Sequence, residues 1–181
     1  MFRHPRPIAS AKGAAVLYPK ALLESLGWFD EDYFLLYEDF DLAFRARHAG
    51  AEILFVPQSR VYHKSSASMG GRKSVSSFHY SERNLQLVLL KNFPARALIR
   101  YLPGFLMVKA FRVYFTLRAG CFGAYLRGNL ASIRLIPSAL AKRREILGTS
   151  RISAAKFGSL LRKNFFSERS AFRRGVYDVP V

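Results

Sequence analysis

Charge is distributed unequally along this chain, and the division falls at His63. Residues 1–63 contain seven Lys and Arg against eight Asp and Glu, whereas residues 64–181 contain 22 against four. This asymmetry predicts two parts with different tasks, a balanced part that contains acids and a basic part that meets an anionic partner. Nucleic acid and a membrane surface are both candidates for that partner.

Composition excludes several classes of protein. Half of the 181 residues are apolar and 14% are aromatic, which indicates a folded core and excludes a disordered polyelectrolyte. The single cysteine, Cys121, excludes a disulfide framework and a cysteine-based zinc site. The longest charge-free apolar runs after His63 are Tyr101–Val108 and Ala119–Leu126, with eight residues each. A spanning helix needs about 20 residues, so we expect no plain transmembrane span.

Local patterns predict an α/β segment followed by helices. Short strands are expected at Ala14–Tyr18, Ile53–Val56 and Arg60–His63. Helices are expected at residues 19–26 and 38–48, ended by Gly27 and Gly50. The Ser- and Gly-rich stretch Lys64–Ser77 predicts a mobile loop. From Phe78 onward the pattern is helical, with breaks expected near Pro94, Pro103, Pro137 and Gly148.

Acidic residues are concentrated in the stretch FDEDYFLLYEDFD, residues 29–41, which holds six of the eight acids before His63. The carboxylates of such a cluster repel one another. They are useful where a protein binds a metal ion or a sugar hydroxyl or transfers a proton. Acids also complement a helix dipole, which explains Asp30, Glu31 and Asp32 equally well. Three carboxylates within residues 38–41 exceed what a helix cap needs. The pattern alone leaves an acid–base site and a metal site open.

Several spaced motifs between Gly13 and Ser68 resemble, in order, the second half of the catalytic domain of family 2 glycosyltransferases, which have the GT-A fold. They are the Gly13-Ala14-Ala15 turn, GWFDEDYF, YEDFDLAFR, the Ala49-Gly50 stop, FVP and VYHKSSAS. The similarity is greatest to the rhamnosyltransferase-like bacterial branch and covers roughly a third of the chain. The later Arg83-Asn84 pair and the basic helical tail also resemble that branch, less specifically.

The resemblance implies a fold and a division into domains. Residues 1–77 would form the C-terminal half of a GT-A catalytic domain, a partial α/β fold with few short strands that carries the acceptor side. A mainly α-helical extension would follow, with a basic, apolar, membrane-associated region at residues 78–147. Residues 148–181 would form a basic helical or flexible tail.

The resemblance also implies catalytic and metal-binding roles. The family's ED motif falls on Glu38 and Asp39. Asp39 would be the catalytic base of an inverting transfer and would deprotonate the acceptor hydroxyl, while Glu38 would orient the acceptor or Asp39. His63 matches a histidine that approaches the metal–diphosphate, where the metal is Mg²⁺ or Mn²⁺ with carboxylate and phosphate partners. A strand-end histidine bonded to the backbone is the alternative interpretation of His63.

Four further residues are expected to bind substrate: Gly13, Trp28, Asp30 and Asp41. Gly13 suits either a loop where the backbone approaches a substrate closely or an ordinary turn. Trp28 and the neighbouring Phe29 suit either stacking on a sugar face or packing in the core. Arg45 has the spacing for a pair with Asp41, and reaching a diphosphate is its alternative role.

The implied activity is transfer of a sugar, with rhamnose as the candidate, from a nucleotide-sugar donor to a glycan or polyprenyl-linked acceptor in bacterial cell-surface polysaccharide synthesis. Such an enzyme has an N-terminal nucleotide-binding half with an acidic metal motif. Only about 12 residues precede Gly13 and none supplies that motif. We therefore expect a truncated enzyme that is inactive alone.

The cations of the helical half do not form one stripe. Helical angles place Lys109 and Arg112 about 60° apart and Arg118 on nearly the opposite side. Some cations should pack on protein and others reach an interface, so we expect peripheral contact with an anionic membrane at the cytoplasmic face of the inner membrane. No nucleic-acid-binding signature accompanies the charge, and nucleic acid is not the expected partner. The alternative function is a noncatalytic module that binds membrane or nucleic acid.

Overall fold

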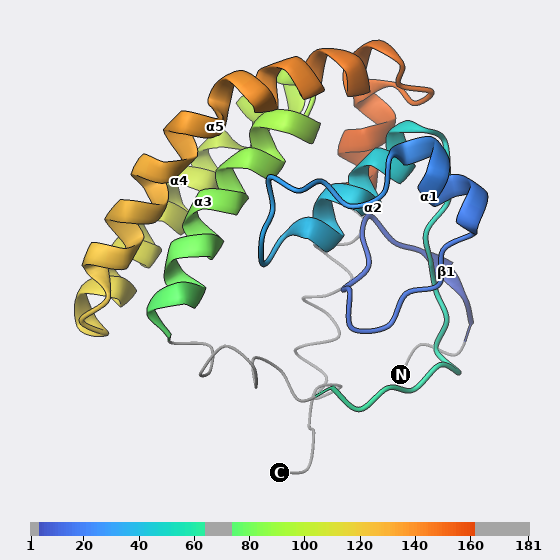
Figure 1. The fold of residues 1–181 in the computed structure, drawn as a ribbon. Coiled ribbons are helices and arrows are strands. Elements are labelled where there is room, and N and C mark those ends of the chain that lie inside the picture. Colours follow the sequence, from blue (N-terminus) through green and yellow to red (C-terminus); the bar gives the residue numbers. More distant parts are fainter. Residues whose placement is uncertain (1–3, 64–73, 162–181) are drawn as a thin grey trace.

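The computed structural model describes residues 4–63 and 74–161, and within them the chain is mainly helical. Its elements in order are strand β1 (Arg6–Pro7), helices α1 (Lys20–Leu26) and α2 (Glu38–His48), strand β2 (Leu54–Phe55), and helices α3 (Val75–Asn92), α4 (Ala95–Arg118) and α5 (Phe122–Gly148). Residues 154–161 are also helical. In Figure 1 the three long helices gather on one side and α1, α2 and the strands on the other. This is a partial α/β segment followed by a helical extension.

The helices expected around the acidic stretch are confirmed. α1 begins after Pro19 and ends at Gly27, whose φ of 71° lies in the left-handed region that glycine adopts at low cost. α2 covers Glu38–His48, and Gly50 follows it with a φ of 89°. The local spacing of helix formers and glycines was therefore sufficient to locate both helices.

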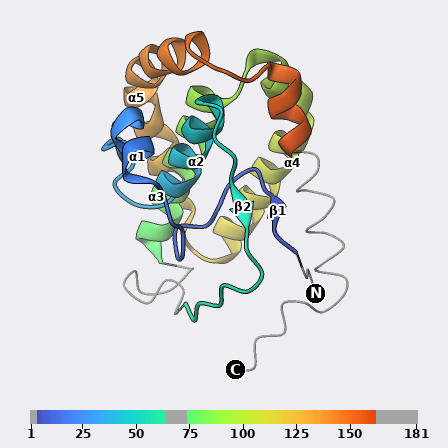
Figure 2. The same cartoon turned by 90° about the vertical axis from the view of Figure 1, so that its right-hand side faces the viewer.

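Two of the three expected strands do not form. Residues 14–18 make no ladder, and the Leu17 side chain is 96% exposed. Residues 60–63 are irregular and exposed. A strand needs a neighbour for its backbone groups, and β1 and β2 pair only with each other among the described residues, antiparallel with Arg6 opposite Phe55. The strand expected at Ile53–Val56 is shortened to β2, which lies beside β1 in Figure 2.

Of the four expected helix breaks, those near Pro94 and Gly148 are confirmed, and those near Pro103 and Pro137 are wrong. α3 ends at Asn92 before Pro94, and α5 ends at Gly148. Pro103 and Pro137 instead lie inside α4 and α5, which run through them. Each proline removes one backbone donor, and the remaining hydrogen bonds of these long helices maintain the helical path. Of the expected loop Lys64–Ser77, residues 64–73 lie outside the described residues, and α3 begins at Val75.

A hydrophobic core joins α2 to the helical extension. The rings of Phe44, Phe93 and Phe157 lie 5.2–5.5 Å apart, centroid to centroid, and come from α2, the α3–α4 turn and the last helical stretch. His48 adds a ring stacked on Phe157 at 4.9 Å, and its Nε2 donates to the carbonyl of Asn92 at 2.8 Å. Burial of this cluster fixes α2 against α3.

A buried carboxylate holds the three long helices together. Glu82 of α3 is fully buried and accepts hydrogen bonds from Lys109 Nζ at 2.8 Å and from Arg112 Nε, both on α4. Lys109 also donates to Asn129 Oδ1 of α5 at 2.6 Å. Lys109 and Arg112 thus point into the protein, whereas Arg118 is exposed. A carboxylate taken out of water requires such partners, because an unpaired one is costly.

None of the helices in residues 4–63 and 74–161 combines the length and apolar character that crossing a bilayer requires.

The crossing of α3 and α5 depends on a glycine, which gives the first testable prediction. A Cβ at Gly128 would lie 2.4 Å from the His79 carbonyl oxygen and 2.9 Å from Glu82 Cβ. Gly128→Ala should therefore push the helices apart and lower the free energy of unfolding by about 1–3 kcal/mol in urea denaturation. Gly104→Ala is the matched control, since that Cβ would meet nothing within 4 Å and alanine favours the helix. Equal stability of the two variants would contradict the close crossing.

Candidate functional site

The first turn of α2 presents the ED motif beside Gly13. Asp39 Oδ2 accepts the backbone N–H of Gly13 at 2.8 Å, and Asp39 Oδ1 accepts the N–H of Phe40 at 2.8 Å. A Cβ on residue 13 would lie 3.1 Å from Asp39 Cβ, so the backbone approaches as closely as glycine permits. The structure thus brings together two residues that the sequence singled out separately. Asp39 remains half-buried and within reach of solvent.

Glu38, the other residue of the motif, has an unused oxygen. Its Oε2 is buried and has no hydrogen-bond partner within residues 4–63 and 74–161. Burial raises the pKa of the Glu38 carboxyl above its usual value, and the charge of Asp39 raises it further. A buried polar atom without a partner carries a free-energy cost that asks for an explanation.

The chain enters α2 through a strained turn. Leu36 and Tyr37 have φ values of 68° and 69°, in a region that residues with a Cβ adopt rarely and at a cost. Asn84 of α3, which is fully buried, stabilises this turn by donating from Nδ2 to the carbonyl oxygens of Leu35 and Leu36, each at 2.7 Å. α3 of the helical extension therefore determines where Glu38 and Asp39 begin α2.

Asp41 has a different environment from the ED motif. It is fully buried and accepts hydrogen bonds from Arg45 Nε at 2.8 Å and Asn92 Nδ2 at 2.8 Å, while Lys91 Nζ lies 2.9 Å from its carboxylate. The Asp41–Arg45 pair expected from their spacing is confirmed. The substrate contact expected for Asp41 does not fit this burial, and the structure gives Asp41 a structural role.

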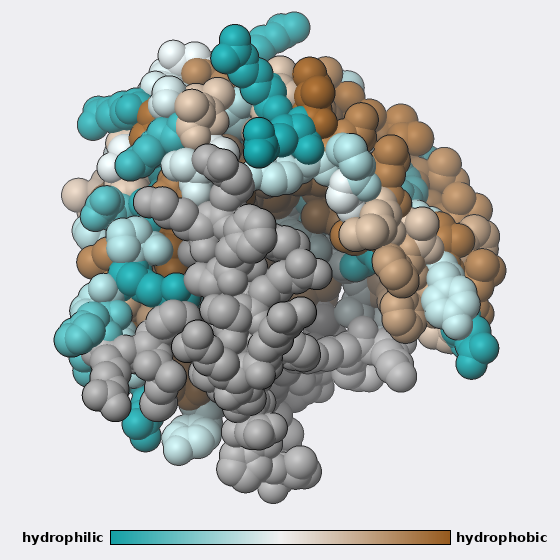
Figure 3. Space-filling model, turned by 180° about the vertical axis from the view of Figure 1, so that it is seen from behind, coloured by the Kyte–Doolittle hydropathy of each residue, from teal (hydrophilic) through white to brown (hydrophobic). Residues whose placement is uncertain are grey.

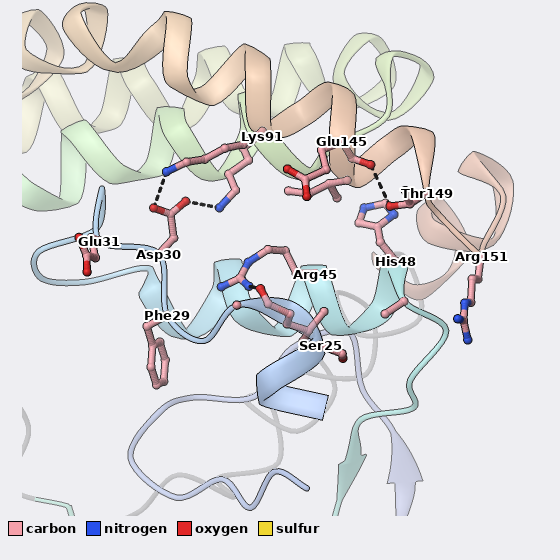
Figure 4. A pocket seen from close by; sticks show the side chains of 15 residues that line it. Ser25, Phe29, Asp30, Glu31, Arg45, His48, Lys91, Glu145, Thr149 and Arg151 are labelled. Carbon is pink, nitrogen blue, oxygen red and sulfur yellow. Dashed lines mark hydrogen bonds and ion pairs between the residues drawn. The ribbon is translucent and has the colours of Figure 1, made fainter. Parts of the chain in front are cut away.

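Asp30 and Asp32 are bound by lysines of the helical extension. Lys91 Nζ lies 2.5 Å and Lys142 Nζ 2.6 Å from the Asp30 carboxylate, and Lys142 Nζ is also 2.6 Å from Asp32 Oδ2. Figure 4 shows the Asp30 carboxylate directed from its loop towards Lys91 of α3. Burial tends to raise the pKa of Asp30, but the hydrogen bonds from Lys142 and Lys91 outweigh it and hold the pKa at about 2.

These ion pairs border a pocket of about 610 Å³ between α2, α5 and the turn after α1. Its lining includes Asp30, Arg45, Lys91 and Lys142 but neither residue of the ED motif. Three of the cations that line it, Arg45, Lys91 and Lys142, are already paired with carboxylates or backbone carbonyls. The expected substrate contact of Asp30 therefore competes with its two lysine partners.

The aromatic pair after α1 lies on the surface. Trp28 is 48% exposed and Phe29 is 51% exposed, so the core-packing alternative is wrong for both. The backbone of Trp28 is itself a structural contact, because its carbonyl accepts Arg45 Nη2 at 2.6 Å. Stacking on a sugar face stays a prediction for these rings.

The metal site implied by the resemblance is not assembled by the described residues. His63 is exposed, and within residues 4–63 and 74–161 no group of three or more His, Cys, Asp and Glu side chains could hold a metal ion. Mg²⁺ and Mn²⁺ prefer several oxygen ligands, and one imidazole does not provide them. The metal-binding role of His63 stays a prediction.

Sequence reasoning missed the residues that support the site from the helical extension. Lys91 and Lys142 gave no signal, since each is one of many cations in a basic half. Asn84 was noted within the Arg83-Asn84 pair, but its contact with the turn before α2 depends on the fold. Tyr18 was also missed. It lies near the site, and burial and the charge of Asp39 raise the pKa of its hydroxyl.

The Asp30 ion pairs give a prediction for the pH dependence of stability. Because the folded-state pKa is about 2 and the unfolded value is near 3.8, the stabilisation is complete above pH 4 and is lost as the pH falls towards 2. Asp30→Asn should lower the free energy of unfolding at pH 7 by about 2 kcal/mol and flatten its decline between pH 4 and 2. Glu31→Gln, an exposed neighbour, should change neither. An unchanged pH profile for Asp30→Asn would refute the assignment.

Comparison with known proteins relates this site to a family. Residues 1–79 match the family model described as glycosyltransferase like family 2. Two N-acetylglucosaminyl-diphospho-decaprenol L-rhamnosyltransferases, from Mycobacterium tuberculosis strains CDC 1551 / Oshkosh and ATCC 25618 / H37Rv, are each 35% identical over 65 residues. The alignment covers 36% of this chain and 21% of each relative, so the chain spans about a fifth of their length. No solved structure matches the chain. Over residues 1–79 the chain is therefore similar to family 2 glycosyltransferases, among them the two rhamnosyltransferases.

Proposed function

We propose that this chain supplies the acceptor side of an inverting family 2 glycosyltransferase with a GT-A catalytic domain. The enzyme would transfer a sugar, with rhamnose as the candidate, from a nucleotide-sugar donor to a glycan or polyprenyl-linked acceptor in cell-surface polysaccharide synthesis. It would act at the cytoplasmic face of the bacterial inner membrane. The observation that carries the proposal is the pairing of Asp39 with Gly13 at the start of α2, within the matched residues.

Asp39 has the geometry of a general base. Its two backbone hydrogen bonds fix the carboxylate, while the residue stays partly exposed, so that an acceptor hydroxyl can reach it. In the proposed step the acceptor oxygen attacks the anomeric carbon and its proton passes to Asp39. The bond from the anomeric carbon to the diphosphate oxygen breaks, and the nucleoside diphosphate leaves with that electron pair. Attack from the face opposite the leaving group inverts the configuration.

Glu38 supports the acceptor in this proposal. Its buried Oε2 lacks a partner among the described residues and adjoins Asp39 in sequence. A hydrogen bond from a second acceptor hydroxyl to this oxygen would satisfy it and orient the sugar. Substrate binding would then offset the free-energy cost of the unpartnered oxygen of Glu38.

Donor binding needs residues beyond those described. The lysines and arginine near the acidic stretch are engaged with carboxylates and carbonyls, and the described residues do not form a metal site. We therefore assign no step to Mg²⁺ or Mn²⁺, which stays a proposal for the whole enzyme, and we expect the chain alone to transfer no sugar.

Transfer by this chain joined to its natural upstream coding sequence tests the base assignment. Asp39→Asn removes the proton acceptor but keeps the shape and one hydrogen-bond acceptor. It should lower the transfer rate by about 10²–10⁴-fold, measured as sugar incorporated into a lipid-linked acceptor. Circular dichroism and the unfolding midpoint should stay close to those of the parent.

Glu31→Gln is the matched control, because Glu31 is an exposed acid of the same stretch. It should leave the rate within about twofold of the parent. If Asp39→Asn transfers sugar as fast as this control, Asp39 is not the base and the proposed mechanism fails.

A further inference from the structure

α5 carries an apolar stripe that faces away from the core. Its members recur at spacings of three and four residues, which places them on one face of the helix. Each is between 37% and 57% exposed: Phe122, Leu126, Leu130, Ile133, Ile136 and Leu140. The opposite face of α5 packs on α3 through Gly128. α5 therefore has one face for the protein and a second apolar face that nothing in the described residues covers.

α4 is exposed over most of its surface. Only Ala97 and Thr116 of its 24 residues are buried. Its outward apolar side chains are between 43% and 73% exposed and include large aromatic rings: Ile99, Leu102, Leu106, Met107, Val108, Phe111, Tyr114, Phe115 and Leu117. Figure 3 shows hydrophobic residues gathered along the side of the molecule that the long helices form.

The apolar surfaces of α4 and α5 meet in a groove. Leu102 of α4 and Ile133 and Ile136 of α5 line the same cavity of about 360 Å³, together with residues of α3. Leu102 therefore joins α4 to the α5 stripe at this point, on the side of α4 opposite Phe111. Contiguous apolar patches of this kind mark an interaction site, whereas scattered exposed apolar residues do not.

Charges around this apolar surface have one sign. No Asp or Glu occurs from Arg83 to Arg144. Lys109 and Arg112 are directed inward and pair with Glu82. The cations that are exposed near the apolar surface are therefore other arginines. Six of them have no ion pair among the described residues: Arg96, Arg100, Arg118, Arg127, Arg134 and Arg144. Helical angles place Arg100 and Arg118 on the same face as Phe111, towards the two ends of α4.

We propose that the apolar surface of α4 and α5 lies on an anionic lipid bilayer. The leucine and aromatic side chains would enter the boundary between headgroups and acyl chains, and the arginines would reach the lipid phosphates. Charge favours this occupant over a second copy of the chain, because self-association would bring arginines against arginines. Nucleic acid would satisfy the arginines but would leave the apolar side chains without a hydrophobic partner.

This proposal deepens the membrane association within the proposed function but rests on the surface of α4 and α5. Vesicle binding is measured without donor or acceptor. Failure of lipid binding is therefore distinguishable from failure of sugar transfer.

Vesicle flotation tests the apolar contact. The chain should float with vesicles of three parts phosphatidylcholine to one part phosphatidylglycerol. The triple variant Phe111→Ser, Phe115→Ser and Leu130→Gln should bind at least about tenfold more weakly, since three exposed apolar contacts are lost. Its circular dichroism should match the parent, because each of these side chains is more than half exposed.

The control variant changes apolar residues that are equally accessible but lie outside α4 and α5. Leu17→Gln with Tyr62→Gln fits, since these side chains are 96% and 99% exposed. It should bind vesicles within about twofold of the parent. Equal binding by the triple variant and this control would overturn the proposal.

Charge gives the second arm. Arg100→Gln and Arg118→Gln should each weaken binding to the anionic vesicles by about fivefold, and raising the salt concentration should weaken parental binding. Pure phosphatidylcholine vesicles should bind less than the anionic ones. Equal binding to both lipid mixtures would overturn the proposal. A stable dimer that does not bind vesicles, and that the triple variant dissociates, would also overturn the proposal. The surface would then join two copies of the chain.

Discussion

Lys91 is the residue on which the arrangement of this protein most depends. It is buried in α3 and lies within 2.9 Å of both Asp30 and Asp41, so one cation neutralises carboxylates from a loop and from α2. Lys142 of α5 binds Asp30 and Asp32 in the same way. Carboxylates this close would repel one another without these cations. The balanced N-terminal part and the basic helical part are therefore one electrostatic unit, although their charges first suggest separate tasks.

This unit divides the acidic stretch by function. Asp30, Asp32 and Asp41 are engaged by cations of the helical extension, whereas Glu38 and Asp39 form no ion pair among the described residues. α3 contributes to both groups, since Asn84 holds the strained turn that precedes Glu38. The strain and the unpartnered Glu38 oxygen are costs that the folded chain carries next to Asp39. Gly13 then completes the site by bringing a backbone donor to Asp39.

Sequence patterns predicted the helix bounds and ion pairs that depend on residues near in sequence. They failed for strands and contacts that depend on partners far away in sequence. The bounds of α2 and the Asp41–Arg45 pair follow from local spacing, and both are confirmed. The strand expected at Ala14–Tyr18 has no neighbouring strand in the described residues, and Pro103 did not end α4 because its flanking helical bonds hold. The resemblance identified Glu38 and Asp39. Only the fold shows that Asp41, two positions later, forms an ion pair with a lysine 50 residues away.

The division of the acids can be tested most directly by comparing the stability of two variants. Asp41→Asn should lower the free energy of unfolding by about 3 kcal/mol or more, because it leaves Lys91 and Arg45 buried without that charge. Asp39→Asn removes no ion pair and should cost about 1 kcal/mol or less in the same urea titration. Equal losses for the two variants, or a larger loss for Asp39→Asn, would contradict the account.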